Sequence, residues 1–295
     1  MKYTSTKTLM DIEFEQLSKR IAGLHFGTSS GYKLFDESLG GAGFENGSLI
    51  FIGGRPCMGA TMLALNILIN QIGNFNDNEV SIYIATKDSA AIMMQRILAV
   101  AYETEIASLQ NGKISMEQLE QIKNGDIGSK LENSLVLIEA ENPTIRGILS
   151  LIEQLTSQGK KIRFLTIDTV HSLHPGDQVA GDVGIEKMLD DLRVVATKFQ
   201  FPVLLIGEVL RSVEYREGPK IPQLKDLKDS RSIASKVDQV YFVLRPVYYE
   251  IPGESCVLDN DFQIICKKNR YGPLHFMDLQ VNTKRLKITS APSLN

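Results

Sequence analysis

The sequence predicts an α/β fold built on a doubly wound, mostly parallel sheet with an antiparallel extension at its C-terminal end. From Ser48 onward, short apolar runs alternate with segments of helical periodicity, which is typical of helices on both faces of a parallel sheet. The runs are apolar on both faces, as doubly covered strands are. Beyond residue 260, short connections leave no room for helices, which predicts antiparallel pairing.

Six buried strands and four covering helices are expected in the first part of this fold. The strands are expected at residues 49–52, 82–85, 135–138, 164–167, 203–206 and 241–244. The helices are expected at residues 61–72, 89–102, 144–157 and 183–199. The antiparallel strands are expected at residues 262–266, 276–281 and 286–289.

An amphipathic helix is expected ahead of the sheet, at residues 9–24. Its apolar stripe recurs at spacings of three and four residues and consists of Met10, Phe14, Leu17, Ile21 and Leu24. Glycine-rich segments after it predict a boundary near Gly27. We therefore expect a linker-like helix over residues 1–27 and one main domain over residues 28–295. The stripe packs either on its own domain or on an adjacent subunit.

Composition excludes several classes of protein. The 295 residues are 43% hydrophobic and 23% charged, which argues for a folded core and against disorder. The net charge of -3 gives no global signal for nucleic acid, so any such affinity has to come from a local basic patch. The three cysteines form no metal-binding pair, and no segment has signal-peptide or membrane-span character. We expect a cytoplasmic protein without a membrane partner.

A strand, a turn and a helix at residues 48–72 carry the pattern of a phosphate-binding loop. In the pattern G-x-x-x-x-G-K-[ST], backbone N–H groups converge on phosphate at a helix N-terminus. Both glycines and the hydroxyl residue are present, but Ala60 replaces the lysine. The expected nucleotide-binding residues are Gly54, Arg55, Pro56, Cys57, Met58, Gly59, Ala60 and Thr61.

The missing lysine changes the expected chemistry of this loop. That lysine reaches the β- and γ-phosphates, so its loss removes charge stabilisation from the nucleotide and from the transferring group. Backbone amides still accept phosphate, and Thr61 remains a candidate magnesium ligand. The sequence therefore predicts weaker nucleotide binding and inefficient hydrolysis. The alternative is a glycine-bearing turn that never meets a nucleotide.

Together with this loop, several other segments resemble the C-terminal motor domain of DnaB-type replicative helicases. They occur in the family's order over about residues 10 to 290 and lie at residues 30–41, 55–59, 165–168, 211–214, 228–238 and 268–273. Arg231 departs from the family's usual glycine. The resemblance implies a RecA-like P-loop fold, ATP and Mg²⁺ as cofactors, single-stranded DNA as ligand and assembly into a ring hexamer.

The same resemblance identifies further substitutions at the catalytic positions. Asp168 keeps the family's Walker B identity and, with Thr61, is the implied magnesium ligand. Lys87 stands where the family has the glutamate that activates water, and Glu208 where it has the glutamine that senses the γ-phosphate. The general base is therefore expected to be missing, unless the neighbouring Asp88 replaces it.

The three substitutions predict a connected change. We expect Lys87 to form an ion pair with Glu208 or Asp168 in the space that magnesium and γ-phosphate would fill. In the alternative, Lys87 supplies the missing cation to a bound nucleotide. Tight, magnesium-dependent ATP binding distinguishes the second interpretation from the first.

Two groups of basic residues are further candidates. The resemblance implies DNA binding by a glycine- and proline-broken loop that carries Arg211, Arg216, Lys220, Lys225, Lys228 and Arg231, with Lys236 at its end. It also implies that Lys268 and Arg270 act on a neighbouring subunit's nucleotide. A solvated loop and ordinary surface charge are the alternatives. His171 and His174 are expected to be loop residues rather than a metal pair.

Two functions from different classes follow. One is an ATP-dependent DNA helicase or translocase, with Lys87 as a substitute cation. The other is an ATPase-deficient homologue that joins or regulates an active helicase ring through a homo- or hetero-assembly. A recombination- or clock-type ATPase fits the loop segments less well.

Overall fold

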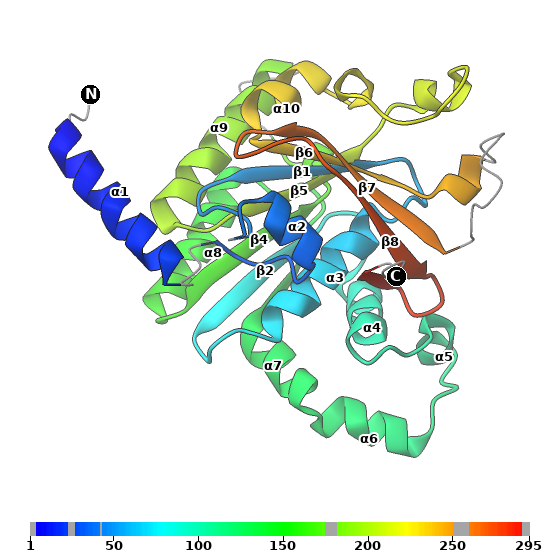
Figure 1. Cartoon of the computed structure of the whole chain (residues 1–295). Helices are drawn as coiled ribbons and strands as arrows, with labels where there is room; N and C mark the ends of the chain where they lie inside the picture. Colours follow the sequence, from blue (N-terminus) through cyan, green and yellow to red (C-terminus); the bar gives the residue numbers. More distant parts are fainter. Residues whose placement is uncertain (1–3, 23–26, 42, 175–181, 250–259, 291–295) are drawn as a thin grey trace.

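The computed structural model describes residues 4–22, 27–41, 43–174, 182–249 and 260–290. A nine-stranded sheet runs through it in the order β3-β2-β4-β5-β1-β6-β7-β8-β9 (Figure 1). Strands β1 to β6 pair in parallel, and β6 to β9 pair antiparallel. The predicted doubly wound sheet with an antiparallel extension is confirmed. Leu24 and Cys256 lie outside the described residues.

The parallel strands form the buried centre, as their uniformly apolar sequences predict. They are β1 (Leu49–Gly54), β2 (Glu79–Ala85), β3 (Leu135–Glu139), β4 (Lys161–Asp168), β5 (Val203–Glu208) and β6 (Gln239–Leu244). Every residue of β1, β2 and β6 is buried. In register, Phe51 of β1 lies between Leu205 of β5 and Val240 of β6.

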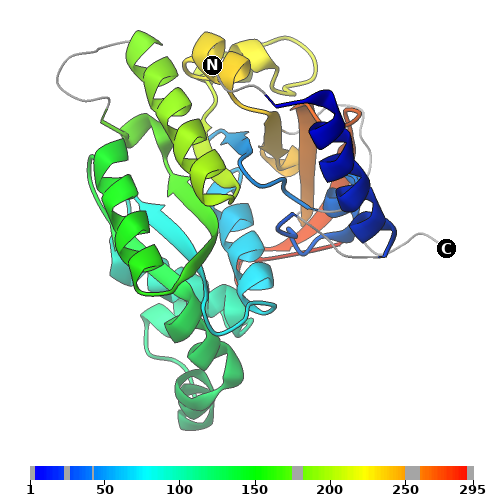
Figure 2. The ribbon, with the colours of Figure 1, turned by 90° about the vertical axis from the view of Figure 1, so that its left-hand side faces the viewer.

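Helices cover both faces of the sheet (Figures 1 and 2). Helices α8 (Ile145–Ser157) and α9 (Asp182–Phe199) lie on one face, and α3 (Ala60–Ile72) and α4 (Ala90–Ala101) lie on the other. The four expected helices thus form within one residue of their expected ends. Ser89 caps α4 and Thr144 caps α8 by accepting backbone N–H groups.

Short elements complete the chain. The antiparallel strands are β7 (Asp261–Asn269), β8 (Phe276–Asn282) and β9 (Lys287–Ser290). Small helices that the periodicity did not predict are α2 (Lys33–Ser38), α5 (Ile106–Gln110), α6 (Met116–Asn124), α7 (Asp126–Ser134) and α10 (Ser230–Lys236). Among the described helices, none offers the long apolar stretch that crossing a membrane needs.

Helix α1 (Thr6–Ile21) stands away from the sheet in Figure 1. Its predicted apolar stripe is exposed: Phe14 is 55% and Ile21 87% accessible, and Met10 and Leu17 are also exposed. The interpretation that the stripe packs on its own domain is therefore wrong for these residues. An exposed apolar face of this kind is typical of an interaction surface.

Candidate functional site

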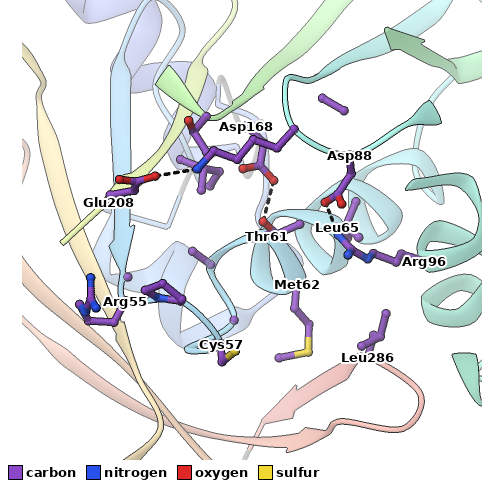
Figure 3. Close-up of a pocket in the computed structure, with 18 of the residues that line it drawn as sticks. Arg55, Cys57, Thr61, Met62, Leu65, Asp88, Arg96, Asp168, Glu208 and Leu286 are labelled. Carbon is purple, nitrogen blue, oxygen red and sulfur yellow. Dashed lines mark hydrogen bonds and ion pairs between the residues drawn. The ribbon is translucent and has the colours of Figure 1, made fainter. Parts of the chain in front are cut away.

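A cavity of about 480 Å³ lies where β1, β2, β4 and β5 end (Figure 3). Ligand sites of open α/β sheets lie at this carboxyl edge because the loops after parallel strands converge there. Seven of the eight expected phosphate-loop residues line the cavity, together with Lys87, Asp88, Asp168 and Glu208. Met58 is the exception: its side chain is buried, and its sulfur accepts the backbone N–H of Arg245.

The phosphate loop wraps the start of α3, as its sequence predicts. Strand β1 ends at Gly54 and α3 begins at Ala60. Between them, Cys57 and Gly59 have φ angles of 68° and 96°, the left-handed region in which successive backbone N–H groups form an anion-binding nest. A Cβ at Gly59 would lie 2.9 Å from the Phe262 ring, so only glycine fits without a shift.

Arg55 of the loop points away from the phosphate position. Its Nε donates to Glu214 Oε1 at 2.8 Å, and its Nη1 donates to the carbonyl of Val209 at 3.0 Å. Glu214 also pairs with Arg211 at 3.3 Å, and the two guanidinium groups lower the pKa of its carboxyl, Arg55 first. Arg55 thus ties the phosphate loop to the basic loop, a link that the sequence did not reveal.

Asp168 and Thr61 face each other across the cavity floor (Figure 3). The Thr61 hydroxyl donates to Asp168 Oδ2 at 2.7 Å. The hydroxyl of Tyr83, a buried residue of β2, donates to the same oxygen at 2.8 Å. Burial raises the pKa of Asp168, and the two hydroxyl donors only partly oppose this.

This donor set fits Mg²⁺ poorly. Magnesium needs near-octahedral oxygen ligands and usually completes its shell with substrate phosphates. One Asp168 oxygen already accepts two hydroxyl protons, which leaves less of this carboxylate to a cation. Sequence reasoning missed Tyr83, although a tyrosine in a buried strand signals that its hydroxyl has a partner.

Lys87 and Glu208 form the ion pair expected from their sequence positions. Lys87 Nζ lies 2.6 Å from Glu208 Oε1, and Lys228 Nζ lies 4.0 Å from Glu208 Oε2. The hydrogen bond from Lys87 lowers the pKa of Glu208. Of the two expected partners, Lys87 therefore takes Glu208 rather than Asp168. Figure 3 shows Asp168 between Glu208 and Asp88.

Asp88 pairs with an arginine, whereas a general base has to contact the attacking water. Its Oδ2 accepts from Arg96 Nη1 at 2.6 Å, and Figure 3 places this pair beyond Thr61 from Glu208. The carboxylate oxygen Oδ2 of Asp88 is therefore occupied by this guanidinium. The geometry gives no support to Asp88 as a substitute base. Sequence reasoning did not identify Arg96 as a lining residue.

His171 joins three segments around Glu208. Its Nε2 accepts the Glu208 backbone N–H at 3.1 Å, and its Nδ1 lies 3.2 Å from Asp229 Oδ2. Burial lowers the pKa of His171, with Lys228 as a smaller cause. His174 bonds through its backbone N–H to the carbonyl of Pro143. In the described ranges, no three potential metal ligands are grouped, and His171 lies in a short 3-10 helix, Val170–Ser172.

The basic loop divides into exposed and internally bonded cations. Arg216 donates to both carboxylate oxygens of Asp226, at 2.6 and 2.7 Å, and Lys220 donates to the backbone carbonyl of Glu214. These two residues hold the loop in shape. Arg211, Lys225, Lys228 and Arg231 are exposed to solvent, although Arg211 also pairs with Glu214 and Lys228 with Glu208.

Lys268 and Arg270 lie where the parallel strands β1 and β6 begin, whereas the phosphate loop lies where β1 ends. Lys268 Nζ donates to the carbonyls of Ala234 and Val237 at 2.8 and 2.6 Å, and burial lowers its pKa. Arg270 pairs with the buried carboxylate of Asp238 at 2.8 Å. Asp238 also accepts the N–H of Leu49, where β1 begins. The two cations therefore face away from their own chain's nucleotide loop.

The comparisons with known proteins agree with this geometry. The DnaB-like helicase C terminal domain family matches residues 27–290. A probable plasmid replicative DNA helicase of Chlamydia psittaci is 28% identical over 89% of this chain and 55% of its own length. The replicative DNA helicase DnaB of Geobacillus stearothermophilus is 28% identical over 86% of this chain and 54% of its own length. The chain thus spans about half the length of these relatives.

Solved structures show the same fold. The ATPase domain of G40P covers 99% of this chain and all of its own length, with a TM-score of 0.85 and 21% identity. A DnaB-like replicative helicase covers 99% of this chain and 68% of its own, with a TM-score of 0.82 and 20% identity. The match to RadB recombinase is weaker, with a TM-score of 0.56 and 14% identity. The fold is RecA-like, and the chain belongs to the DnaB-like helicase C-terminal domain family.

Proposed function

We propose that this chain is a DnaB-like helicase motor domain that binds single-stranded DNA and nucleotide but hydrolyses ATP weakly or not at all. The observation that carries this proposal is the Lys87–Glu208 ion pair at 2.6 Å in a cavity whose phosphate loop begins its helix with Ala60. The two side chains occupy positions at which the family has the water-activating glutamate and the γ-phosphate sensor.

The expected deficit in rate is large. A positioned general base contributes about 10²–10⁴-fold to a reaction rate. Loss of one preorganised group that stabilises developing charge costs about 10²–10³-fold. Lys87 is a cation and cannot accept a proton, Glu208 is held by Lys87, and Asp88 is held by Arg96. Phosphoryl transfer is therefore left without a base and without the lysine of the loop.

The DNA-binding and assembly roles rest on surface features. The exposed cations Arg211, Lys225, Lys228 and Arg231 can contact a phosphate backbone. Lys268 and Arg270, which face away from their own site, can approach a neighbouring subunit. We propose that residues 1–27 act as a linker, that residues 28–295 form the motor domain, and that it assembles in the cytoplasm as a homo-oligomeric ring or joins an active helicase ring.

A second candidate is a competent translocase that uses Lys87 as its cation. It is favoured by the position of Lys87, whose half-exposed side chain lines the cavity. To act on a nucleotide, Lys87 would have to leave Glu208, and the reaction would still need a base.

The experiment compares DNA-stimulated ATP turnover in the unmodified protein with that in a variant carrying Ala60→Lys, Lys87→Glu and Glu208→Gln. Ala60→Lys restores the cation of the loop, and Lys87→Glu restores the base. Glu208→Gln is needed with them, because Lys87→Glu alone would place two carboxylates side by side. We expect turnover only in the triple variant. Appreciable turnover in the unmodified protein would establish the competent translocase instead. Single-stranded DNA binding, measured separately by fluorescence anisotropy, tests the other half of the proposal.

A further inference from the structure

The phosphate loop retains the backbone N–H groups that hold the α- and β-phosphates of a nucleotide. Its backbone nest, formed around Cys57 and Gly59, lies at the start of α3, and backbone N–H groups there bind phosphate without a side-chain cation. The Ala60 methyl group at the start of the helix leaves this nest open to the cavity. These features serve the phosphates that the loop itself wraps, which are the α- and β-phosphates.

The surroundings of a third phosphate are unfavourable. Ala60 supplies no charge, and Lys87, a cation that lines the cavity, is already paired with Glu208 at 2.6 Å. A γ-phosphate that drew Lys87 away from Glu208 would leave this carboxylate with only the more distant Lys228, at 4.0 Å, beside another anion. Like charges at such short range repel, and each disfavours the ionised form of the other.

Magnesium, which normally offsets the negative charge of the phosphates, also lacks suitable ligands in this cavity. One oxygen of Asp168 accepts the hydroxyl protons of Thr61 and Tyr83, at 2.7 and 2.8 Å. Tyr83 is fully buried and has no room to turn away without leaving its hydroxyl unsatisfied. Magnesium therefore gains little from this carboxylate.

We propose that the cavity is a magnesium-independent site for a nucleoside diphosphate and that Glu208 discriminates against the triphosphate. This inference rests on the proposed function, because it assumes that the phosphate loop binds nucleotide. It goes further by specifying the ligand: a diphosphate held as a structural or regulatory ligand rather than a triphosphate held as a substrate.

Isothermal titration calorimetry with ADP and ATP, each with Mg²⁺ and with EDTA, tests this assignment on the full chain. We expect ADP to bind about 3- to 10-fold more tightly than ATP, a repulsion discounted for the partial exposure of Glu208. Magnesium should change either dissociation constant less than about 2-fold, since Thr61 and Asp168, its two candidate ligands, are bonded to each other. Tighter binding of ATP with Mg²⁺ than of ADP would overturn the inference.

Two variants test whether Glu208 causes the preference for ADP over ATP. Glu208→Gln should raise the affinity for ATP relative to ADP at least about 3-fold, because it removes the repelling charge and releases Lys87. The matched control is Glu153→Gln, since Glu153 pairs with Lys198 at 3.1 Å with similar exposure but lies outside the cavity. The control should leave the ratio unchanged. An unchanged ratio in Glu208→Gln would contradict the role of Glu208.

The outcomes also separate this inference from the proposed function. A preference for ATP with Mg²⁺ but no hydrolysis would remove the diphosphate assignment and leave the proposed function intact. Hydrolysis by the unmodified protein would contradict the proposed function itself. Failure of both nucleotides to bind, with DNA binding preserved, would overturn the assignment and reduce the proposal to DNA binding.

Discussion

Replacing Lys87 by methionine removes the ion pair at the centre of this account while keeping most of the side-chain volume. The pair is short, at 2.6 Å, but its two side chains are 57% and 42% exposed. Solvent screening and side-chain entropy limit such pairs to about 0.2–1 kcal/mol. We therefore expect Lys87→Met to lower the free energy of unfolding by no more than about 1 kcal/mol, or the melting temperature by about 2–4 °C.

A buried carboxylate in the same protein provides the contrast. Asp238 is fully buried, accepts the Leu49 N–H at 2.9 Å, and pairs with Arg193 and Arg270. Asp238→Ala removes the buried acceptor of the Leu49 N–H and of two arginines, and hydrogen bonds to charged groups contribute about 1.5–3 kcal/mol each, so this should be the more damaging change.

Urea unfolding followed by circular dichroism measures both variants on one scale. We expect the midpoint of Lys87→Met to stay near that of the unmodified protein and the midpoint of Asp238→Ala to fall clearly. A loss above about 2 kcal/mol for Lys87→Met would show that the pair holds the fold together. A structural need would then explain both Lys87 and Glu208, and their presence would no longer indicate that catalytic groups were replaced.

Three further predictions concern other groups. Tyr83→Phe removes a hydrogen bond to a buried carboxylate and should cost about 1–3 kcal/mol in urea unfolding; an unchanged midpoint would contradict the bond. Burial lowers the pKa of His171, so the unfolded chain binds more protons and stability should fall as pH drops below about 6.5; His171→Gln should flatten this dependence, and an unaltered slope would refute it. Alanine at Lys225 or Arg231 should reduce the salt slope of single-stranded DNA binding by about 0.7 each, whereas equal slopes would exclude phosphate contacts there.

Much of the fold follows from local sequence. The strands at residues 49–54 and 203–208 are apolar on both faces, and such runs form where helices cover both sides of a sheet. Helices α5 and α6 could not be predicted in the same way, because they bury no residues and are only 5 and 9 residues long, too short for apolar spacing to identify them.

The candidate site was predictable where one residue type departed from a pattern. Ala60, Lys87 and Glu208 each stand out against the resemblance, and opposite charges at two of these positions predicted their pairing. Contacts between distant segments carry no such signal. The Arg55–Glu214 link spans 159 residues, and only the folded chain brings its two ends together.

The central claim, still untested, is that the cavity hydrolyses ATP weakly or not at all. The direct measurement is phosphate release from γ-labelled ATP, with unmodified protein in excess over nucleotide and saturating Mg²⁺ and single-stranded DNA. A single turnover under these conditions reports chemistry even when product release is slow. We expect no release above the protein-free control. Release of one phosphate per bound ATP within minutes would contradict the claim.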